Sequence, residues 1–292
     1  MKKISVKEGV KSKLFRKPKA LKDALEGLGD KRLAFVPTMG ALHQGHLCLV
    51  KEAVKVAQVI VVSIFVNARQ FAEGEDFETY PRNLELDCQR LDSLNLGESL
   101  LFVYAPSLED VFSGSLDLNI PKEADVLCAK TRPHFFKGVC EVLYAFFSQI
   151  KPSDAFFGEK DFQQYMVVTA LAEMYFPALK IHLVETKREL NGLAMSSRNS
   201  YLTPQEHTKA AFLFKGMQQL QAHIDQGEHD VKCLCDTLSL FYKKQGFKLD
   251  YVCILSEETL TDQVKISHKS RLFVALYLNS IRLIDSMKLS VV

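Results

Sequence analysis

The segment Val59–Val66 constrains the fold of this chain most strongly. Its sequence, Val-Ile-Val-Val-Ser-Ile-Phe-Val, is apolar at almost every consecutive position. A strand with one face in water alternates apolar and polar side chains, whereas a strand of a parallel sheet is buried on both faces and is apolar throughout. The segment therefore predicts a strand of a parallel sheet that is covered by helices on both sides.

Similar apolar runs alternate with helical patterns along the first two thirds of the chain. Further strands are predicted at 32–36, 99–104, 154–157 and 181–185, and helices at 45–57, 83–94, 135–151 and 162–175. This order predicts an α/β fold with a Rossmann-like parallel sheet. After about residue 187 the pattern becomes α+β, with helices at 204–226 and 230–245 and strands at 249–255, 271–278 and 282–284. We therefore predict an N-terminal domain, 1–186, and a smaller C-terminal domain, 187–292.

Two glycines and two histidines lie between the first large strand and its helix. The segment Pro37–His46 reads Pro-Thr-Met-Gly-Ala-Leu-His-Gln-Gly-His. The N-terminus of a helix presents backbone N–H groups and partial positive charge, which suits a phosphate. The imidazoles of His43 and His46 add donors that can follow charge moving on a phosphoryl group. The segment therefore predicts a phosphate site, and the alternative is a pair of surface histidines in a loop.

Composition narrows the class of protein without identifying it. The 292 residues are 47% apolar and 25% charged, with a net charge of +2, which is ordinary for a globular protein. We expect no nucleic-acid partner. We also expect no membrane association, since no apolar run approaches the length of a membrane span. The basic segment 2–19 is interpreted as a solvated or frayed terminus. The seven cysteines are an odd number without a Cys-x-x-Cys pair. We expect most of them to be small buried hydrophobes in a reducing cytoplasm.

Four further segments make the Pro37–His46 motif specific. They are Phe-Val-Asn-Ala-Arg-Gln-Phe at 65–71, Tyr-Pro-Arg at 80–82, Gly-Glu-Lys-Asp-Phe-Gln-Gln at 158–164 and Asn-Gly-Leu-Ala-Met-Ser-Ser-Arg-Asn at 191–199. In this order, from about Leu33 to Ile284, the chain resembles the pantothenate synthetase family, whose members join pantoate to β-alanine with ATP. The resemblance implies a homodimer whose Rossmann-like domain binds nucleotide and pantoate and whose smaller C-terminal domain is a lid.

The resemblance also implies the residues of the site. Catalytic roles fall on His43, His46, Lys160 and Arg198. ATP contacts are expected from Met39, Gly40, Ala41, Leu42, His43, Gln44, Gly45, His46, Gly158, Glu159, Lys160, Asp161, Lys187, Met195, Ser196, Ser197 and Arg198. By residue type alone, a lysine and a serine–serine–arginine run suit phosphate. Without the resemblance, Lys160 would be interpreted as a surface lysine paired with Glu159 or Asp161, and the serine–arginine run as a polar linker.

Substrate and metal contacts follow from the same resemblance. Gln70, Gln164 and Asn67 are expected to bind pantoate, whose hydroxyls and carboxylate suit amide donors and acceptors, and Gln70 also to bind β-alanine. Asp87 is the candidate contact to Mg²⁺, directly or through water. Leu86 precedes it, where some relatives carry a second carboxylate.

The implied reaction forms a pantoyl-adenylate intermediate and then transfers the acyl group to β-alanine, releasing pyrophosphate and AMP. The pantoate carboxylate is ionised at neutral pH and needs no general base. Two departures from the family pattern are visible. Ala68 stands where relatives have proline, so we expect a more mobile turn. In the 132–138 segment, His134 comes one position early and Lys137 replaces arginine, which would lose a bidentate contact.

Two other functions remain open on the residues alone. One is another adenylate-forming or nucleotidylyl-transferring enzyme of the same superfamily, which would share His43 and His46 but would not need Gln70 and the 158–164 segment together. The other is a non-catalytic nucleotide sensor on the same fold.

Overall fold

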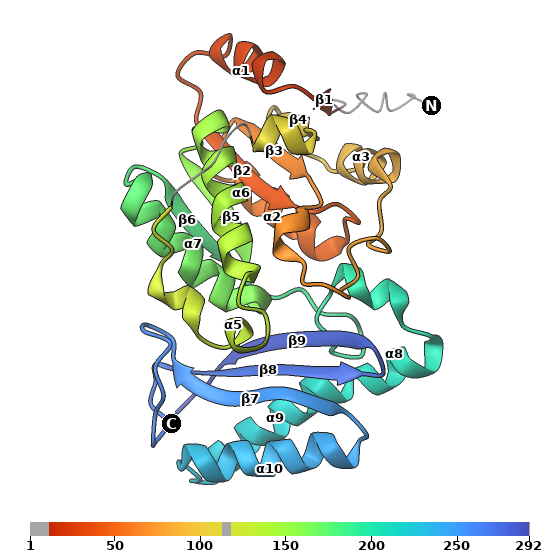
Figure 1. Ribbon diagram of the computed structural model, residues 1–292, viewed down its shortest axis with the longest axis vertical. Coiled ribbons are helices and arrows are strands. Elements are labelled where there is room, and N and C mark those ends of the chain that lie inside the picture. The colour runs from red at the N-terminus through yellow and green to blue at the C-terminus, as the bar shows by residue number, and fades with distance from the viewer. Residues whose placement is uncertain (1–11, 113–117, 292) are drawn as a thin grey trace, which may run out of the picture. The chain divides into compact units, whose positions relative to one another are not determined.

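The computed structural model describes residues 12–112 and 118–291, which form two compact units (Figure 1). The first unit contains the residues up to Ile120 together with Lys137–Phe157 and Leu171–Val184. The second contains Pro121–Phe136, Gly158–Ala170 and the residues from Glu185 onward. The predicted domain boundary between residues 186 and 187 stays a prediction.

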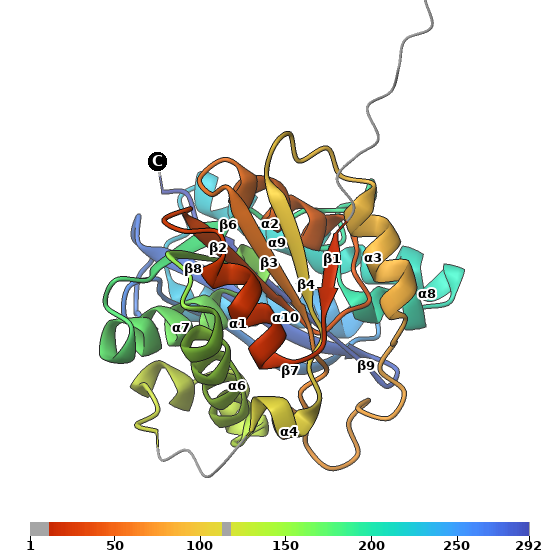
Figure 2. The same ribbon diagram turned by 90° about the horizontal axis from the view of Figure 1, so that it is seen from above.

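A six-stranded parallel sheet is the frame of the first unit, and it confirms the predicted Rossmann-like α/β fold. The strand order is β1-β4-β3-β2-β5-β6, and β1, β4, β3 and β2 can be followed side by side in Figure 2. The order reverses at β2, and ligands of such sheets bind beyond the carboxyl ends of the strands at a reversal of this kind. The strands are β1 (Lys13–Phe15), β2 (Leu33–Thr38), β3 (Val59–Ile64), β4 (Leu100–Tyr104), β5 (Asp154–Gly158) and β6 (Lys180–Val184).

Helices cover both faces of this sheet, which explains its apolar strands. Ala34 and Val36 of β2 share a core cluster with Leu47 and Val50 of α2 (Gln44–Val54). Phe35 points to the opposite face, where its ring centroid lies 5.7 and 6.1 Å from those of Phe146 and Phe147 in α6 (Phe135–Ile150). Each strand thus needs apolar side chains at odd and even positions alike. The remaining elements of the unit are α1 (Pro18–Glu26), η1 (Ala68–Gln70), α3 (Leu84–Asp92) and α4 (Leu108–Val111).

The interpretation of the basic N-terminal segment is wrong for residues 13–19. β1 pairs with β4 in parallel, and α1 begins at Pro18, a residue favoured in the first helical turn. The many charges obscured two buried side chains, because Phe15 is 6% exposed and Leu21 only 1%. Residues 2–11 of the predicted segment lie outside the described residues.

The cysteines are less buried than predicted. All seven are free thiols, but only Cys128 and Cys140 are buried, and Cys233 is exposed. The prediction that most of them are buried is therefore wrong. Within residues 12–112 and 118–291, no helix combines the length and the apolar character that a membrane crossing requires.

The second unit contains a three-stranded antiparallel sheet with β8 in the centre, flanked by β7 and β9 (Figure 1). Leu272, Val274 and Leu276 of β8 pack with the helices α9 and α10 in one core cluster. Arg271 and Phe273 occupy the alternate positions, which face the other side of the sheet. The bounds are β7 (Lys248–Ser256), β8 (Ser270–Leu278), β9 (Ile281–Lys288), α9 (Phe212–Asp225) and α10 (Val231–Lys244).

Two predicted elements of this unit have different bounds. The helix predicted at 204–226 is divided into α8 (Pro204–Ala210) and α9, with Ala211 between them. The strand predicted at 282–284 extends over the whole of β9. The shorter elements of this unit are η2 (Lys122–Asp125), α5 (Cys128–Thr131), η3 (Glu159–Asp161) and η4 (Ser197–Tyr201), and α7 (Phe162–Tyr175) contributes residues to both units.

Candidate functional site

The turn between β2 and α2 has a strained backbone that a buried carboxylate supports. Gly40 has φ 81° and Ala41 has φ 49°, both in the left-handed region. A Cβ at Gly40 would lie 3.0 Å from Asp87 Oδ2 and from Ile64 Cγ2, so glycine is required there. For Ala41 this conformation costs about 1–2 kcal/mol. The cost is offset where the turn meets α3, because Ala41 N–H donates to Asp87 Oδ2 at 2.9 Å.

Asp87 is an internal support of this turn. Its other oxygen, Oδ1, accepts from Leu42 N–H at 2.7 Å, and the residue is 1% exposed. Burial raises the pKa of the Asp87 carboxyl, while the two backbone donors and the charge of Arg90 act to lower it. Both carboxylate oxygens therefore face backbone N–H groups.

His43 and His46 form a capping box at the N-terminus of α2. Gly45 N–H donates to His43 Nδ1 at 3.1 Å, and His43 N–H donates to His46 Nδ1 at 3.3 Å. The two rings are stacked, with centroids 4.0 Å apart and an interplanar angle of 30°. A nitrogen that accepts a hydrogen bond carries no proton, so each neutral ring carries its proton on Nε2. The fold thus selects the tautomer of both histidines.

Asn67 and Gln70 are joined to this turn within the first unit. Asn67 Nδ2 donates to Gln70 Oε1 at 3.2 Å and to the Gly138 carbonyl at 2.9 Å. Gln70 Nε2 lies 2.7 Å from Met39 Sδ. Asn67 is 1% exposed, so its contacts orient the Gln70 amide.

The η1 turn between them is tied to α6. A Cβ at Gly138 would lie 2.4 Å from the Arg69 carbonyl oxygen, so the two backbones meet too closely for any side chain. Arg69 Nη1 pairs with Glu141 Oε2 at 2.8 Å, and its Cζ lies 3.8 Å from the centroid of the Phe112 ring. These contacts hold the turn that contains Ala68, and the greater mobility expected there stays a prediction.

The predicted ATP contacts at Gly158–Asp161 belong to the second unit. Lys160 Nζ lies 3.2 Å from Asp161 Oδ1, and its side chain is 16% exposed. Glu159 pairs with Arg271 instead, with Arg271 Nη1 2.9 Å from Glu159 Oε1. The interpretation of Lys160 as a surface lysine implied an ion pair with Glu159 or Asp161. The pair with Asp161 is present, but the Lys160 side chain is largely buried.

Two successive glutamines at the start of α7 differ in environment. Gln163 is 5% exposed, accepts from Cys128 N–H at 3.2 Å and donates to the Val126 carbonyl at 2.6 Å. Gln164 is only partly buried. The structure thus separates a glutamine that holds the fold together from its neighbour, which the sequence predicts to contact pantoate.

A short hairpin brings together the last predicted contacts. Met195 N–H donates to the Lys187 carbonyl at 3.0 Å, and Gly192 turns the chain with φ 90°. Ser196 caps η4, its Oγ accepting from Arg198 N–H at 3.3 Å. Lys187 and the 195–198 segment are therefore neighbours within the second unit, as one binding segment requires.

The predicted site residues are divided between the two units. Met39–His46, Asn67, Gln70 and Asp87 belong to the first, and Gly158–Asp161, Gln164, Lys187 and Met195–Arg198 belong to the second. His134 and Lys137, which depart from the family pattern, are both exposed.

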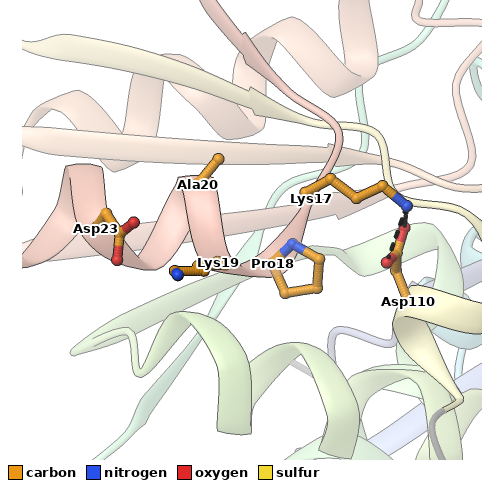
Figure 3. Close-up of a pocket in the computed structure, with 6 residues that line it drawn as sticks. All are labelled: Lys17, Pro18, Lys19, Ala20, Asp23 and Asp110. Carbon is orange, nitrogen blue, oxygen red and sulfur yellow. Dashed lines mark hydrogen bonds and ion pairs between the residues drawn. The ribbon is translucent and has the colours of Figure 1, made fainter.

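Two other places in the described part of the molecule lack the features of a ligand site. Among the described residues, no three His, Cys, Asp or Glu side chains are grouped as a metal site requires. The hollow in Figure 3 is lined by Lys17, Pro18, Lys19, Ala20, Asp23 and Asp110, none of which is a predicted site residue. Lys17 Nζ is paired with Asp110 Oδ2 at 3.0 Å, so we assign this hollow no ligand.

The chain is similar to known proteins along almost its whole length. Residues 13–288 match the family model described as pantoate-beta-alanine ligase. Pantothenate synthetase of Alteromonas mediterranea is 40% identical over 262 residues, which cover 88% of this chain and 92% of that protein. Its counterpart in Bacillus velezensis is 39% identical over 259 residues, covering 88% and 89%.

Solved structures agree with these sequence matches. The crystal structure of pantothenate synthetase from Thermus thermophilus has a TM-score of 0.87 and 32% identity, and covers 94% of this chain and 99% of that one. Pantoate-beta-alanine ligase from Francisella tularensis, crystallised with beta-gamma ATP and beta-alanine, has a TM-score of 0.77 and 32% identity, covering 95% and 97%.

Proposed function

Because this chain belongs to the pantoate-beta-alanine ligase family and catalyses the ATP-dependent synthesis of pantothenate, we propose that His43 and His46 bind the phosphates of ATP. The observation that carries the proposal is the capping box, in which each imidazole accepts a backbone hydrogen bond through Nδ1. Each neutral ring then presents its Nε2–H as a donor. Two such donors on stacked rings at a helix N-terminus are suited to phosphate oxygens.

The first step of the proposed mechanism is adenylation. A carboxylate oxygen of pantoate attacks the α-phosphorus of ATP, the bond from phosphorus to the bridging oxygen breaks, and pyrophosphate leaves. The carboxylate is ionised at neutral pH, so no residue has to remove a proton from it. Catalysis then rests on alignment of the reactants and on stabilisation of phosphate charge.

Lys160 and Arg198 are the proposed cationic contacts to ATP. Lys160 Nζ lies 3.2 Å from Asp161 Oδ1, and the Asp161 side chain is the more exposed of the two. The Lys160 ammonium can therefore leave this carboxylate and pair with a phosphate oxygen instead. Arg198 lies in a segment of hydroxyls and backbone N–H groups capped by Ser196. We include Gly158–Asp161, Lys187 and Met195–Arg198 among the ATP contacts on the basis of family membership.

Gln70 and Gln164 are the proposed contacts to pantoate, and Asn67 is proposed to assist by holding Gln70. In the second step, the neutral amine of β-alanine attacks the acyl carbon of the pantoyl-adenylate, the bond from that carbon to the AMP oxygen breaks and AMP leaves. The new amide nitrogen gives up its extra proton to solvent, and Gln70 also contacts β-alanine. The F. tularensis ligase was crystallised with beta-alanine, which supports this assignment of the second substrate. Asn67 acts by orienting the Gln70 amide, since it is buried and bonded to Gln70 Oε1.

Gln164→Ala tests the pantoate contact. We expect KM for pantoate to rise about 10-fold or more, as loss of a hydrogen bond to a charged group implies. KM for ATP should change by less than about 2-fold, because no hydrogen bond to ATP is removed. Steady-state measurement of AMP release, with pantoate and ATP varied in turn, gives both values. An equal rise in the two KM values would contradict the assignment, and a melting curve controls for loss of folding.

Asp87 does not suit direct ligation of Mg²⁺. Both of its oxygens accept backbone hydrogen bonds, and the residue is 1% exposed. Magnesium bound with a nucleotide is commonly held by phosphate oxygens and water. We therefore propose Mg²⁺ as a companion of ATP that reaches Asp87 at most through water, and we give Asp87 the role of fixing the β2–α2 turn.

Asp87→Asn separates these two roles. The amide has one acceptor oxygen, so its NH₂ group would face one of the two backbone N–H donors. We expect the free energy of unfolding to fall by about 1–3 kcal/mol and kcat to fall, with the Mg²⁺ concentration for half-maximal rate unchanged. Urea unfolding and a Mg²⁺ titration of turnover measure both. A large shift in the Mg²⁺ requirement at normal stability would instead favour ligation.

We also propose that the enzyme is a homodimer and that it is located in the cytoplasm. A homodimer is supported by the resemblance to the family, and analytical ultracentrifugation of the purified chain would measure it. A cytoplasmic location is supported by seven free thiols.

A further inference from the structure

One buried arginine in the second unit contacts the chain on both sides of Lys160. Arg271 of β8 is 2% exposed. Its Nη1 lies 2.9 Å from Glu159 Oε1, and its Cζ lies 3.9 Å from the ring centroid of Phe162. Glu159 immediately precedes Lys160, and Phe162 follows it by two residues. One guanidinium therefore holds both ends of the short segment that presents the lysine.

A second strand holds the backbone at the same place. Ser286 Oγ of β9 donates to the Glu159 carbonyl at 2.7 Å. Arg271 Nη1 also lies 3.4 Å from Ser286 Oγ, which links the two contacts. Both the side chain and the main chain of Glu159 are thus fixed by adjacent strands of the antiparallel sheet.

The charges around Arg271 also include a second carboxylate. Arg271 Nη2 lies 3.5 Å from Glu257 Oε2, and Glu257 Oε1 also pairs with Lys288 Nζ at 2.7 Å. A guanidinium can satisfy two carboxylates and stack on a ring at once, whereas an ammonium is a point charge without a planar face. The site is therefore built for arginine.

We propose that Arg271 is a positioning residue that sets the placement of the Lys160 ammonium for the reaction. The inference rests on the proposed role of Lys160 in binding ATP. A displacement of about 1 Å in a catalytic group can cost about 100-fold in rate. Arg271 does not touch the nucleotide in this proposal, because its Nη1 and Nη2 contact Glu159, Glu257 and Ser286, and its Nε is buried without a hydrogen-bond partner among the described residues.

The central test is a double-mutant cycle with Arg271→Met and Lys160→Ala. We expect Arg271→Met to lower kcat about 10- to 100-fold. In the Lys160→Ala background the same change should lower kcat by less than about 2-fold, since residues that act as a unit are not additive. An equal fold-change in both backgrounds would overturn the inference. If Lys160→Ala alone retained normal kcat and KM for ATP, the proposed function of Lys160 would fail instead.

Arg282→Met is the matched control for loss of a buried ion pair. Arg282 also joins two strands, with its Nη2 2.7 Å from Asp250 Oδ2 and 3.6 Å from Cys128 Sγ, and neither partner belongs to the Gly158–Asp161 segment. At a similar loss of melting temperature, we expect it to change kcat less than about 3-fold. If both arginine variants lowered kcat equally, the role of Arg271 would be structural support only.

Two milder variants keep the test valid if Arg271→Met does not fold. Arg271→Lys retains a charge without the planar fork, and we expect it to recover only part of the lost kcat. Ser286→Ala removes the 2.7 Å bond to the Glu159 carbonyl and the longer 3.4 Å contact with Arg271 Nη1, and it should lower kcat by about 2- to 10-fold, the equivalent of one hydrogen bond. Wild-type kcat in both variants would contradict the proposal.

Discussion

Replacement of His46 by asparagine is expected to abolish pantoate-dependent exchange of pyrophosphate into ATP while the fold survives. The Asn side chain places its Oδ1 where His46 has Nδ1, so it can still accept from His43 N–H, a contact of 3.3 Å in the wild type. It lacks the Nε2–H that we propose as the donor to phosphate. Loss of one such donor costs about 100- to 1000-fold in rate.

His46→Ala and His43→Asn complete this experiment. The alanine variant loses both the donor and the capping acceptor, so it should match the asparagine variant in activity and be about 1 kcal/mol less stable. His43→Asn keeps a good N-cap residue and should also lose exchange activity. Near-normal exchange in His46→Asn, at wild-type stability, would remove His46 from the catalytic residues.

Replacement of Asp154 by asparagine is expected to cause the largest loss of stability among the changes considered. Asp154 begins β5, and its side chain has no exposed surface. Arg32 donates to both of its oxygens at 2.6 and 2.8 Å, and His182 Nε2 lies 2.7 Å from Oδ1. Loss of these charge-assisted bonds should lower the free energy of unfolding by about 2–4 kcal/mol. The figure is moderate for a buried ion pair because the Arg32 side chain remains 43% exposed and can be hydrated.

The effect of Asp154 has a defined pH dependence. Burial acts to raise the pKa of this carboxyl, but the hydrogen bonds and charges of Arg32 and His182 outweigh it and hold the pKa below its usual range. A depressed pKa in the folded state contributes stability above the unfolded pKa, near 3.9, and that contribution is lost as the pH falls through the folded pKa. The difference between wild type and Asp154→Asn should therefore shrink below about pH 4.

Urea unfolding followed by circular dichroism would measure this difference, because the chain contains no tryptophan. Glu52→Gln is the control, since the exposed pair of Glu52 with Lys55 should contribute less than about 1 kcal/mol. A difference between Asp154→Asn and wild type that grows below pH 4 would contradict the assigned linkage.

The large elements could be predicted because their periodicity is local. Val59–Val66 is apolar at consecutive positions, and β3 occupies Val59–Ile64 as a strand covered on both faces. The N-terminal strand β1 was not predicted, because three residues among lysines are too few to show an apolar periodicity. Phe15 is buried only because β1 pairs with β4. The most buried cysteines could not be identified either, since the burial of a small residue depends on which elements pack over it.

The local order of residues determined three features. They are the N-terminus of α2 with its two histidines, the apolar strands that are buried on both faces, and the family to which the chain belongs. Tertiary structure alone decided that Asp87 supports the strained Gly40–Ala41 turn, whereas the Nε2 tautomer of each histidine follows from the local capping box. Tertiary structure also decided that Arg271, more than 100 residues away in sequence, contacts Glu159 and Phe162 on either side of Lys160. Hydrogen bonds and ion pairs between distant segments depend on how close folding brings them, whereas capping, turn formation and apolar periodicity depend on near neighbours in the chain.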